Sequence, residues 1–286
     1  MHIATGADGL SANVSVHLIT SGGRVLVADS LTYFSTGVLG NDVVVGASFA
    51  GIPTSAVPLS AGAKGLIGHD AGVGRESAGI AGLALAQELG VPAVAIAGSS
   101  AKLSDGRSLL LGTVSHANKA ALELGVERHM LGEKAALLLL KARASTPQPS
   151  VISRVDQTIA RIAGDSDHGI YAVWSFMLVK DKCPNDVFCV ASNAARVMAD
   201  YAASVAPMGV IANDAGMGMD ESGIDGLPVL DERGTPAAAV SVYSARIGDP
   251  MSTYHDGVIS AINRCADRKG VRLGMPARVA AEIMSR

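Results

Sequence analysis

Two aspartates, Asp70 and Asp214, each precede a turn of the form Ala-Gly-x-Gly. Glycine adopts a positive φ without steric cost and lets a ligand approach the backbone closely. A carboxylate beside such a turn can accept a proton or orient a substrate, so both aspartates are predicted to be catalytic. The predicted substrate-binding glycines are Gly72, Gly74, Gly216 and Gly218. The alternative is that each aspartate only caps its own turn through hydrogen bonds to the backbone.

A serine at the end of an apolar run is the candidate nucleophile. Ser48 lies in VVVGASFAG, which resembles a nucleophile elbow but has alanine at the position of the second glycine. His116 would be its general base in a hydrolytic triad, with an aspartate orienting the imidazole. The second half keeps Ser192 but has Ala261 in place of the histidine, so only the first half could hold a triad. Alternatively, Ser48 ends a strand and its hydroxyl bonds to the backbone.

Two cations occupy matching places in the motif Ser-Ala-Lys/Arg-Leu/Ile-x-Asp. Lys102 and Arg246 follow the motif's first residues, Ser100 and Ser244. A cation after a strand end can bind a substrate carboxylate or phosphate, and arginine can do so with two parallel hydrogen bonds. These four residues are therefore predicted to bind substrate. The alternative is an ion pair with the aspartate that ends the same motif.

The sequence predicts no cofactor. The spacing of the glycines does not fit the dinucleotide-binding pattern, because four residues separate Gly74 from the next glycine. The carboxylates of Asp70, Glu76, Asp214 and Asp220 could hold a hard cation such as Mg²⁺, but their spacing forms no metal-ligand motif.

The chain uses its glycine-rich stretch twice, at 65–83 and at 209–227. The two aspartates are 144 residues apart, and a repeat of half the chain predicts two domains that are folded alike. The predicted domains are residues 1–145 and 151–286, joined by a Pro-containing linker at 146–150. Ten of the nineteen positions are identical: Gly65, Ile67, Asp70, Ala71, Gly72, Gly74, Gly79, Ile80, Gly82 and Leu83.

The elements around these motifs alternate between strand and helix patterns. Residues 14–28 and 158–173 are typical of β-hairpins. Continuous apolar runs indicate buried parallel strands at 41–48, 64–70 and 92–98, and at 185–192, 208–214 and 236–242. Helical patterns cover 50–62, 78–90, 115–125 and 132–144, and 194–206 and 260–270. The predicted fold class is α/β, with two tandem, duplicated three-layer domains, mostly parallel sheets and a pseudo-twofold relation.

Composition excludes several classes of partner. The formal charge of −3 is not the basic charge that is typical of nucleic-acid-binding proteins. No apolar run approaches the length of a membrane span. The three cysteines form no CxxC pair, which favours a cytoplasmic location. Abundant alanine and glycine with only 3% aromatic residues predict closely packing helix faces and a homo-oligomer.

Ligands of open parallel sheets bind beyond the carboxyl ends of the strands, where these polar residues fall. The sequence therefore predicts a small-molecule metabolic enzyme, a hydrolase or lyase that acts on an anionic or amide-bearing substrate. The alternative is a non-catalytic protein that binds or senses an anionic metabolite.

Overall fold

The computed structural model describes residues 12–286, so the first eleven residues of the predicted first domain lie outside the described part. The contacts divide the chain into two compact units. The first consists of the described residues up to Ala71 together with Gly79–Val155, and the second of Gly72–Ala78 and Asp156–Arg286. The predicted linker runs into a 3₁₀ helix, η3 (Pro149–Arg154), which packs against α1 (Ile52–Ala61) of the first unit.

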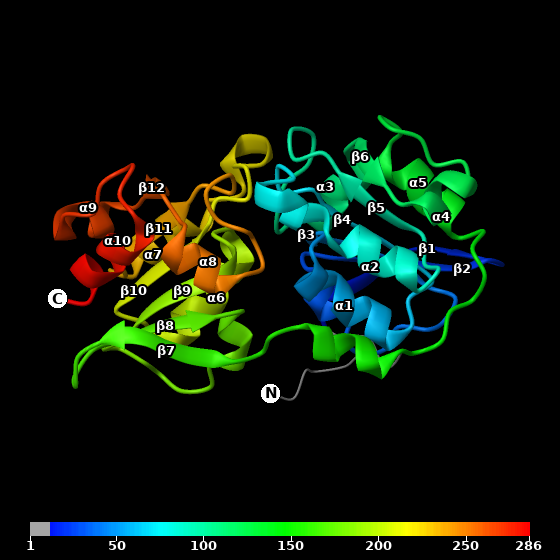
Figure 1. Ribbon diagram of the computed structural model, residues 1–286. Helices are drawn as coiled ribbons and strands as arrows, with labels where there is room; N and C mark the ends of the chain where they lie inside the picture. The colour runs from blue at the N-terminus through cyan, green and yellow to red at the C-terminus, as the bar shows by residue number, and fades with distance from the viewer. Residues whose placement is uncertain (1–11) are drawn as a thin grey trace. The chain divides into compact units, whose positions relative to one another are not determined.

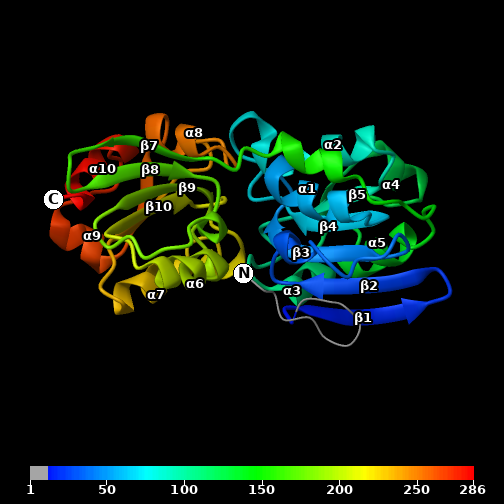
Figure 2. The same ribbon diagram turned by 90° about the horizontal axis from the view of Figure 1, so that it is seen from below.

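The first unit is built on a six-stranded sheet whose strands lie side by side in sequence order (Figure 2). The four central strands are parallel, and the first and last strands are antiparallel to their neighbours. The strands are β1 (Val14–Thr20), β2 (Gly23–Ala28), β3 (Val43–Phe49), β4 (Gly65–His69), β5 (Ala93–Ile96) and β6 (Val114–Ala117).

The second unit repeats this strand order and the same pattern of directions. Its strands are β7 (Ile159–Gly164), β8 (Gly169–Val173), β9 (Val187–Asn193), β10 (Gly209–Asn213), β11 (Ala237–Val240) and β12 (Ile259–Ile262).

Helices cover both faces of each sheet. In the first unit α1 and α2 (Gly82–Glu88) pack together on one face, while α3 (Gly106–Leu111) and α5 (Gly132–Leu139) pack together on the other (Figure 1). The remaining helices of this unit are η1 (Leu31–Tyr33), η2 (Arg75–Ile80, whose first residues belong to the second unit) and α4 (Lys119–Glu123).

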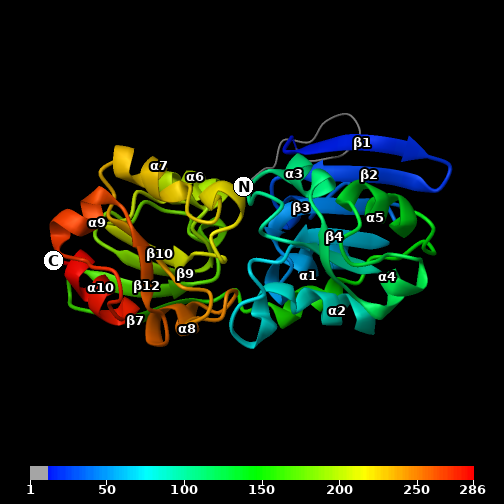
Figure 3. The same cartoon turned by 90° about the horizontal axis from the view of Figure 1, so that it is seen from above.

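In the second unit α6 and α7 cover one face, and α8 and α10 cover the opposite face (Figure 3). Its helices are η4 (Phe176–Leu178), α6 (Arg196–Val205), η5 (Met219–Glu221), α7 (Gly226–Glu232), α8 (Pro250–His255), α9 (Arg264–Lys269) and α10 (Ala277–Met284).

The continuous apolar runs follow from burial on both faces. Along β9, Val187 and Cys189 face the core under α8 and α10, whereas Phe188 and Val190 face the core under α6 and α7. Successive side chains of a strand point to opposite faces, so a sheet between two helical layers needs an apolar residue at every position. The predicted fold class, two tandem three-layer α/β units with mostly parallel sheets, is confirmed.

The helix predicted over 115–125 is wrong at its start. Val114–Ala117 form β6, which pairs antiparallel with β5, and the helix begins only after Asn118. The Asn118 side chain caps α4 by accepting a hydrogen bond from the amide of Ala121 at 3.0 Å. The prediction over 260–270 has the same error, because β12 precedes Asn263 and α9 follows it.

None of the helices in the described range is long and apolar enough to cross a membrane. The three cysteines are free thiols, and burial raises the pKa of Cys189 to about 12. A reactive thiolate is therefore not expected at Cys189.

The connections after neighbouring strands leave toward opposite faces. The loop after β4 leads to α2 on one face, and the loop after β5 leads to α3 on the other. In open sheets such diverging loops leave a crevice at the carboxyl edge, where ligands bind. The loops after β10 and β11 diverge in the same way.

Candidate functional site

Asp70 and Asp214 lie where these diverging loops begin, and both are buried. Oδ1 of Asp70 accepts a hydrogen bond from the amide of Gly98 at 2.9 Å. Oδ1 of Asp214 accepts from the amides of Gly216 and Val242, each at 2.9 Å. Each carboxylate thus ties its own strand end to the loop after the next strand. This is the capping role that the sequence left open, extended from one turn to two loops.

The residues before the two aspartates differ in type but make the same hydrogen bonds. Nδ1 of His69 accepts from the amide of Ala71 at 3.0 Å, and Nε2 lies 3.1 Å from the carbonyl oxygen of Ala101. In the second unit Oδ1 of Asn213 accepts from Ala215 at 2.9 Å, and Nδ2 donates to Ala245 at 3.3 Å. Burial is the largest effect on His69 and lowers its pKa, so the ring is neutral and donates from Nε2.

The two glycine turns have left-handed backbones over four consecutive residues. In the first, the φ angles from Ala71 to Gly74 lie between 49° and 69°, and in the second those from Ala215 to Gly218 lie between 51° and 69°. At the non-glycine positions this conformation costs about 1–2 kcal/mol per residue. Strain repeated at equivalent positions is typical of sites where the backbone meets a ligand. The predicted contacts of the four glycines with a substrate stay a prediction.

Ser100 and Ser244 hold the loops after β5 and β11 in place. Each hydroxyl donates to a carbonyl three residues earlier, at 3.1 Å in the first unit and 2.8 Å in the second. Each also accepts from a backbone amide just before the edge strand, Thr113 at 2.9 Å and Val258 at 2.9 Å. Both hydroxyls therefore have a structural role beside the substrate contact predicted for them.

The structure does not bring Ser48 and His116 together. They lie on β3 and β6, which are separated by two strands, or about 14 Å at the usual spacing. Oγ of the buried Ser48 accepts from the amide of Leu31 at 3.1 Å, and Nδ1 of His116 lies 3.1 Å from the hydroxyl of Ser115. A direct serine–histidine pair therefore has no geometric support.

The two cations of the repeated motif start from matching backbones. The amide of Lys102 donates to the hydroxyl of Ser108 at 2.8 Å, and that of Arg246 donates to Ser252 at 3.0 Å. The guanidinium of Arg246 is partly exposed, and its Nη2 lies 2.8 Å from Oδ2 of Asp249. The ion pair proposed as the alternative for this motif is thus present in the second unit.

Arg246 also binds a carboxylate from the segment Gly72–Ala78, which belongs to the second unit by its contacts. Its Nη1 lies 3.1 Å from Oε2 of Glu76, and this hydrogen bond is the largest effect raising the pKa of Arg246. The Glu76 side chain is 55% exposed. A second arginine from the segment, Arg75, lies 3.2 Å from Oδ2 of Asp256 and donates to the carbonyl of Ser244 at 2.7 Å. Comparison of the two halves does not predict the Arg75 pair, because the residue that corresponds to Arg75 is Met219.

No group of three or more His, Cys, Asp and Glu side chains in residues 12–286 is arranged to hold a metal ion. The carboxylates of Asp70 and Asp214 instead accept backbone hydrogen bonds. A role for Mg²⁺ remains an untested prediction.

The chain matches no protein-family model, no curated protein and no solved structure. Its function therefore has to be argued from the site itself.

Proposed function

We propose that the chain binds an anionic small molecule at the carboxyl edge of the second unit's sheet, and that Arg246 recognises its carboxylate or phosphate. The observation that carries this proposal is the bond between Arg246 and the exposed carboxylate of Glu76. Asp249 orients the guanidinium through Nη2, while Nη1 faces the exposed carboxylate of Glu76, which also lies 3.5 Å from Nε of Arg75. A ligand carboxylate in the place of Glu76 would make the same charge-assisted hydrogen bond.

The surroundings support an anionic ligand of small size. Gly216 and Gly218 open the adjoining turn, where a backbone without side chains lets a ligand approach. Ser244 fixes the loop that carries Arg246. Arg75 supplies a second guanidinium at the same loop through its bond to the Ser244 carbonyl.

The test is titration calorimetry with inorganic phosphate and with succinate. Arg246→Gln should abolish saturable binding. Glu76→Gln should tighten it several-fold, because a neutral amide competes less well for the guanidinium than a carboxylate does. Arg264→Gln is the matched control, since Arg264 is also exposed and paired in the second unit, with Asp231 at 2.7 Å. Binding that is unchanged in Arg246→Gln would refute the proposal.

A catalytic function, hydrolysis or lyase chemistry on the bound anion, is the second candidate. Its support is that Oδ2 of Asp214 has no hydrogen-bond partner among the described residues, while Oδ1 has two. The expected outcome for Asp214→Asn is an unchanged melting temperature, since the amide oxygen can accept both bonds, with turnover lowered about 10²–10⁴-fold. Loss of stability with turnover intact would leave only the capping role. Catalytic roles for Asp70, Ser48 and His116, and anion binding by Lys102, stay predictions.

We also propose that the two units arose by internal duplication, which the shared strand order and the ten identical residues of the repeat support. A cytoplasmic location is consistent with three free thiols.

A further inference from the structure

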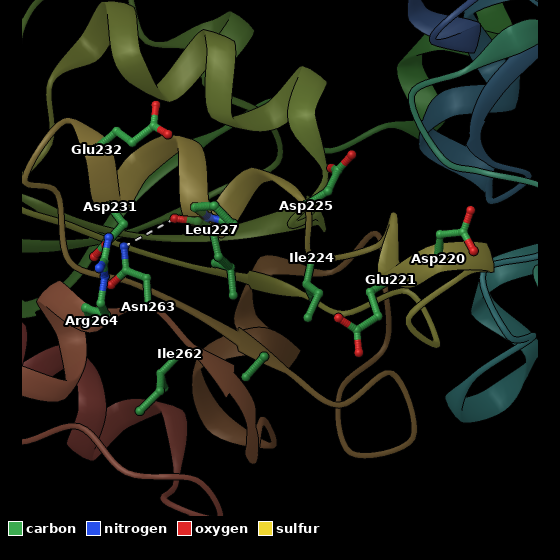
Figure 4. A pocket seen from close by; sticks show the side chains of 12 residues that line it. Asp220, Glu221, Ile224, Asp225, Leu227, Asp231, Glu232, Ile262, Asn263 and Arg264 are labelled. Atoms are coloured by element: carbon green, nitrogen blue, oxygen red, sulfur yellow. Dashed lines mark hydrogen bonds and ion pairs between the residues drawn. The ribbon is translucent and has the colours of Figure 1, made fainter.

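A pocket of about 450 Å³ lies in the second unit between α7 and the edge strand β12 (Figure 4). None of the residues that line it belongs to the loop after β11 that carries Arg246. Figure 4 shows the side chains of Ile224 and Leu227 on one side of the pocket and that of Ile262 on another. The apolar lining consists of Ile224, Leu227, Pro228, Ala261 and Ile262.

Carboxylates stand at both ends of this apolar lining. Glu221 is the last residue of η5, and Glu232 is the last residue of α7, so the two flank Ile224 and Leu227 from opposite ends (Figure 4). Both side chains are exposed at the rim. Asp231 lies beside Glu232, but its Oδ2 is bonded to Nε of Arg264 at 2.7 Å and its Oδ1 to the amide of Cys265 at 2.9 Å.

The equivalent positions in the first unit differ at one end of the pocket. Glu221 and Asp225 correspond to Ser77 and Ala81, 144 residues earlier, and Ala261 corresponds to His116, 145 residues earlier, whereas Glu232 corresponds to another glutamate, Glu88. The first unit folds with the same strand order without a carboxylate at the positions of Glu221 and Asp225. The acidic end of the pocket at Glu221 is therefore not a requirement of the fold.

We propose that this pocket binds an aliphatic diamine or polyamine. An alkyl chain would lie on the apolar lining, and an ammonium group at each end would pair with Glu221 at one end and Glu232 at the other. The placement of the carboxylates supports a ligand with two charges, since Glu221 and Glu232 are eleven positions apart in the chain and lie at opposite ends of the pocket. A ligand with a single ammonium group would leave one of the two carboxylates without a counter-ion. This site does not depend on the function proposed for Arg246.

The test is titration calorimetry of the full chain with cadaverine and with spermidine at moderate ionic strength. One saturable site is expected. Pentylamine, with one charge, and pentanediol, with none, should bind at least roughly tenfold more weakly than cadaverine, because each loses a charge pair at one or both ends. Equal affinity for the diol and the diamine would overturn the role of charge.

The variants Glu221→Gln and Glu232→Gln separate the site from general attraction to an acidic protein. The double variant should weaken spermidine binding roughly tenfold or more. Glu282→Gln is the matched control, because it removes one exposed carboxylate from α10 on the opposite face of the same sheet, and its affinity should equal that of the wild type. Ala261→Trp should fill the pocket and block binding even with both carboxylates present. No saturable binding, or equal losses in the double variant and the control, would overturn the proposal.

Discussion

The buried His69 and the buried Asn213 make equivalent hydrogen bonds in the two units. Each accepts from the amide two residues later and donates to the carbonyl that follows 32 residues on. Neutral imidazole and carboxamide can both supply one donor and one acceptor, but imidazolium cannot accept. Protonation of His69 would therefore break the bond to the Ala71 amide and place a charge in the core.

His69 should accordingly make the stability of the protein depend on pH. Its folded pKa is lowered by burial, while the unfolded value is near 6.5, so the unfolded chain binds more protons at mildly acidic pH. The stabilisation is complete above that value and is lost as the pH falls from about 6.5 toward the folded pKa, by up to about 1.4 kcal/mol per pH unit.

The variant His69→Asn should fold and should lose this part of the pH dependence, since Asn213 fills the same role in the second unit. Denaturant unfolding measured at several pH values from about 8 to about 5 checks this. His69→Ala is the control that should lose stability, because it leaves the Ala71 amide without its hydrogen-bond acceptor. A variant His69→Asn with the pH profile of the wild type would show that other groups titrate.

The polar residues at the strand ends were predictable from the sequence, but their hydrogen-bond partners were not. Asp70 and Asp214 follow buried strands as predicted, yet the amides of Gly98 and Val242 that hold them lie 28 residues away. The type of a residue does not reveal which backbone group lies across a crevice. Lys64 is a second example, since a lysine is expected at the surface. It is buried, and its Nζ donates to the carbonyl of Leu140 at the end of α5 at 2.8 Å.

At the scale of elements, the apolar runs predicted the central strands well because a doubly covered sheet has no polar face. The edge strand β6 escaped prediction, because Ser115 and His116 interrupt its pattern and Asn118 starts a helix directly after it. Four residues are too few for a period of two to be distinguished from a helical one. The left-handed turns were also beyond reach, since alanine and valine at positive φ contradict local preference.

Glycines set how closely the helices of one face approach each other. The amide of Gly82, the first residue of α2, donates to the carbonyl of Ala50 at 2.9 Å. A Cβ at this position would lie 2.2 Å from Oγ of Ser55 and 2.6 Å from the Ala50 oxygen. Gly226, the first residue of α7, is packed in the same way: a Cβ there would lie 2.6 Å from the carbonyl oxygen of Ala194.

Gly82→Ala and Gly226→Ala should each destabilise their own unit by about 3 kcal/mol, because α2 or α7 must move away from backbone atoms. Gly90→Ala is the control: its φ is +69° but nothing lies within 4 Å of the added carbon, so the cost should be about 1 kcal/mol. Thermal unfolding of the three variants makes the comparison. Equal losses of stability in Gly82→Ala and Gly90→Ala would mean that the packing of α2 adapts easily to the added carbon.

At the scale of the whole molecule, the two units differ in their exposed apolar surface. Leu111 at the end of α3 is 77% exposed, and Leu131 and Leu137 at α5 are 45% and 43% exposed. The helices α3 and α5 pack against each other, and Leu131 forms a β-bridge with Thr113, two residues after Leu111. The equivalent residues in the second unit are His255, Pro276 and Glu282. The first unit therefore exposes leucines at three positions where the second unit has other residues, and the exposed apolar residues of the second unit, among them Tyr243, Met251 and Leu273, lie at other positions.

The homo-oligomer stays a prediction, and we propose these exposed leucines as its interface. Exposed leucines gathered on two adjoining helices are typical of a protein–protein contact, and a patch that pairs with its own copy gives a closed twofold dimer. Light scattering at micromolar concentration should report twice the chain mass of 28.9 kDa, with an interface of upwards of ~1,000 Å². Leu111→Glu combined with Leu137→Glu should yield a monomer, because like charges would face each other across the twofold axis. His255→Glu, the equivalent change in the second unit, should leave the dimer intact. A wild-type monomer would contradict the oligomer prediction. A double variant that is still a dimer would show that the interface lies on another surface.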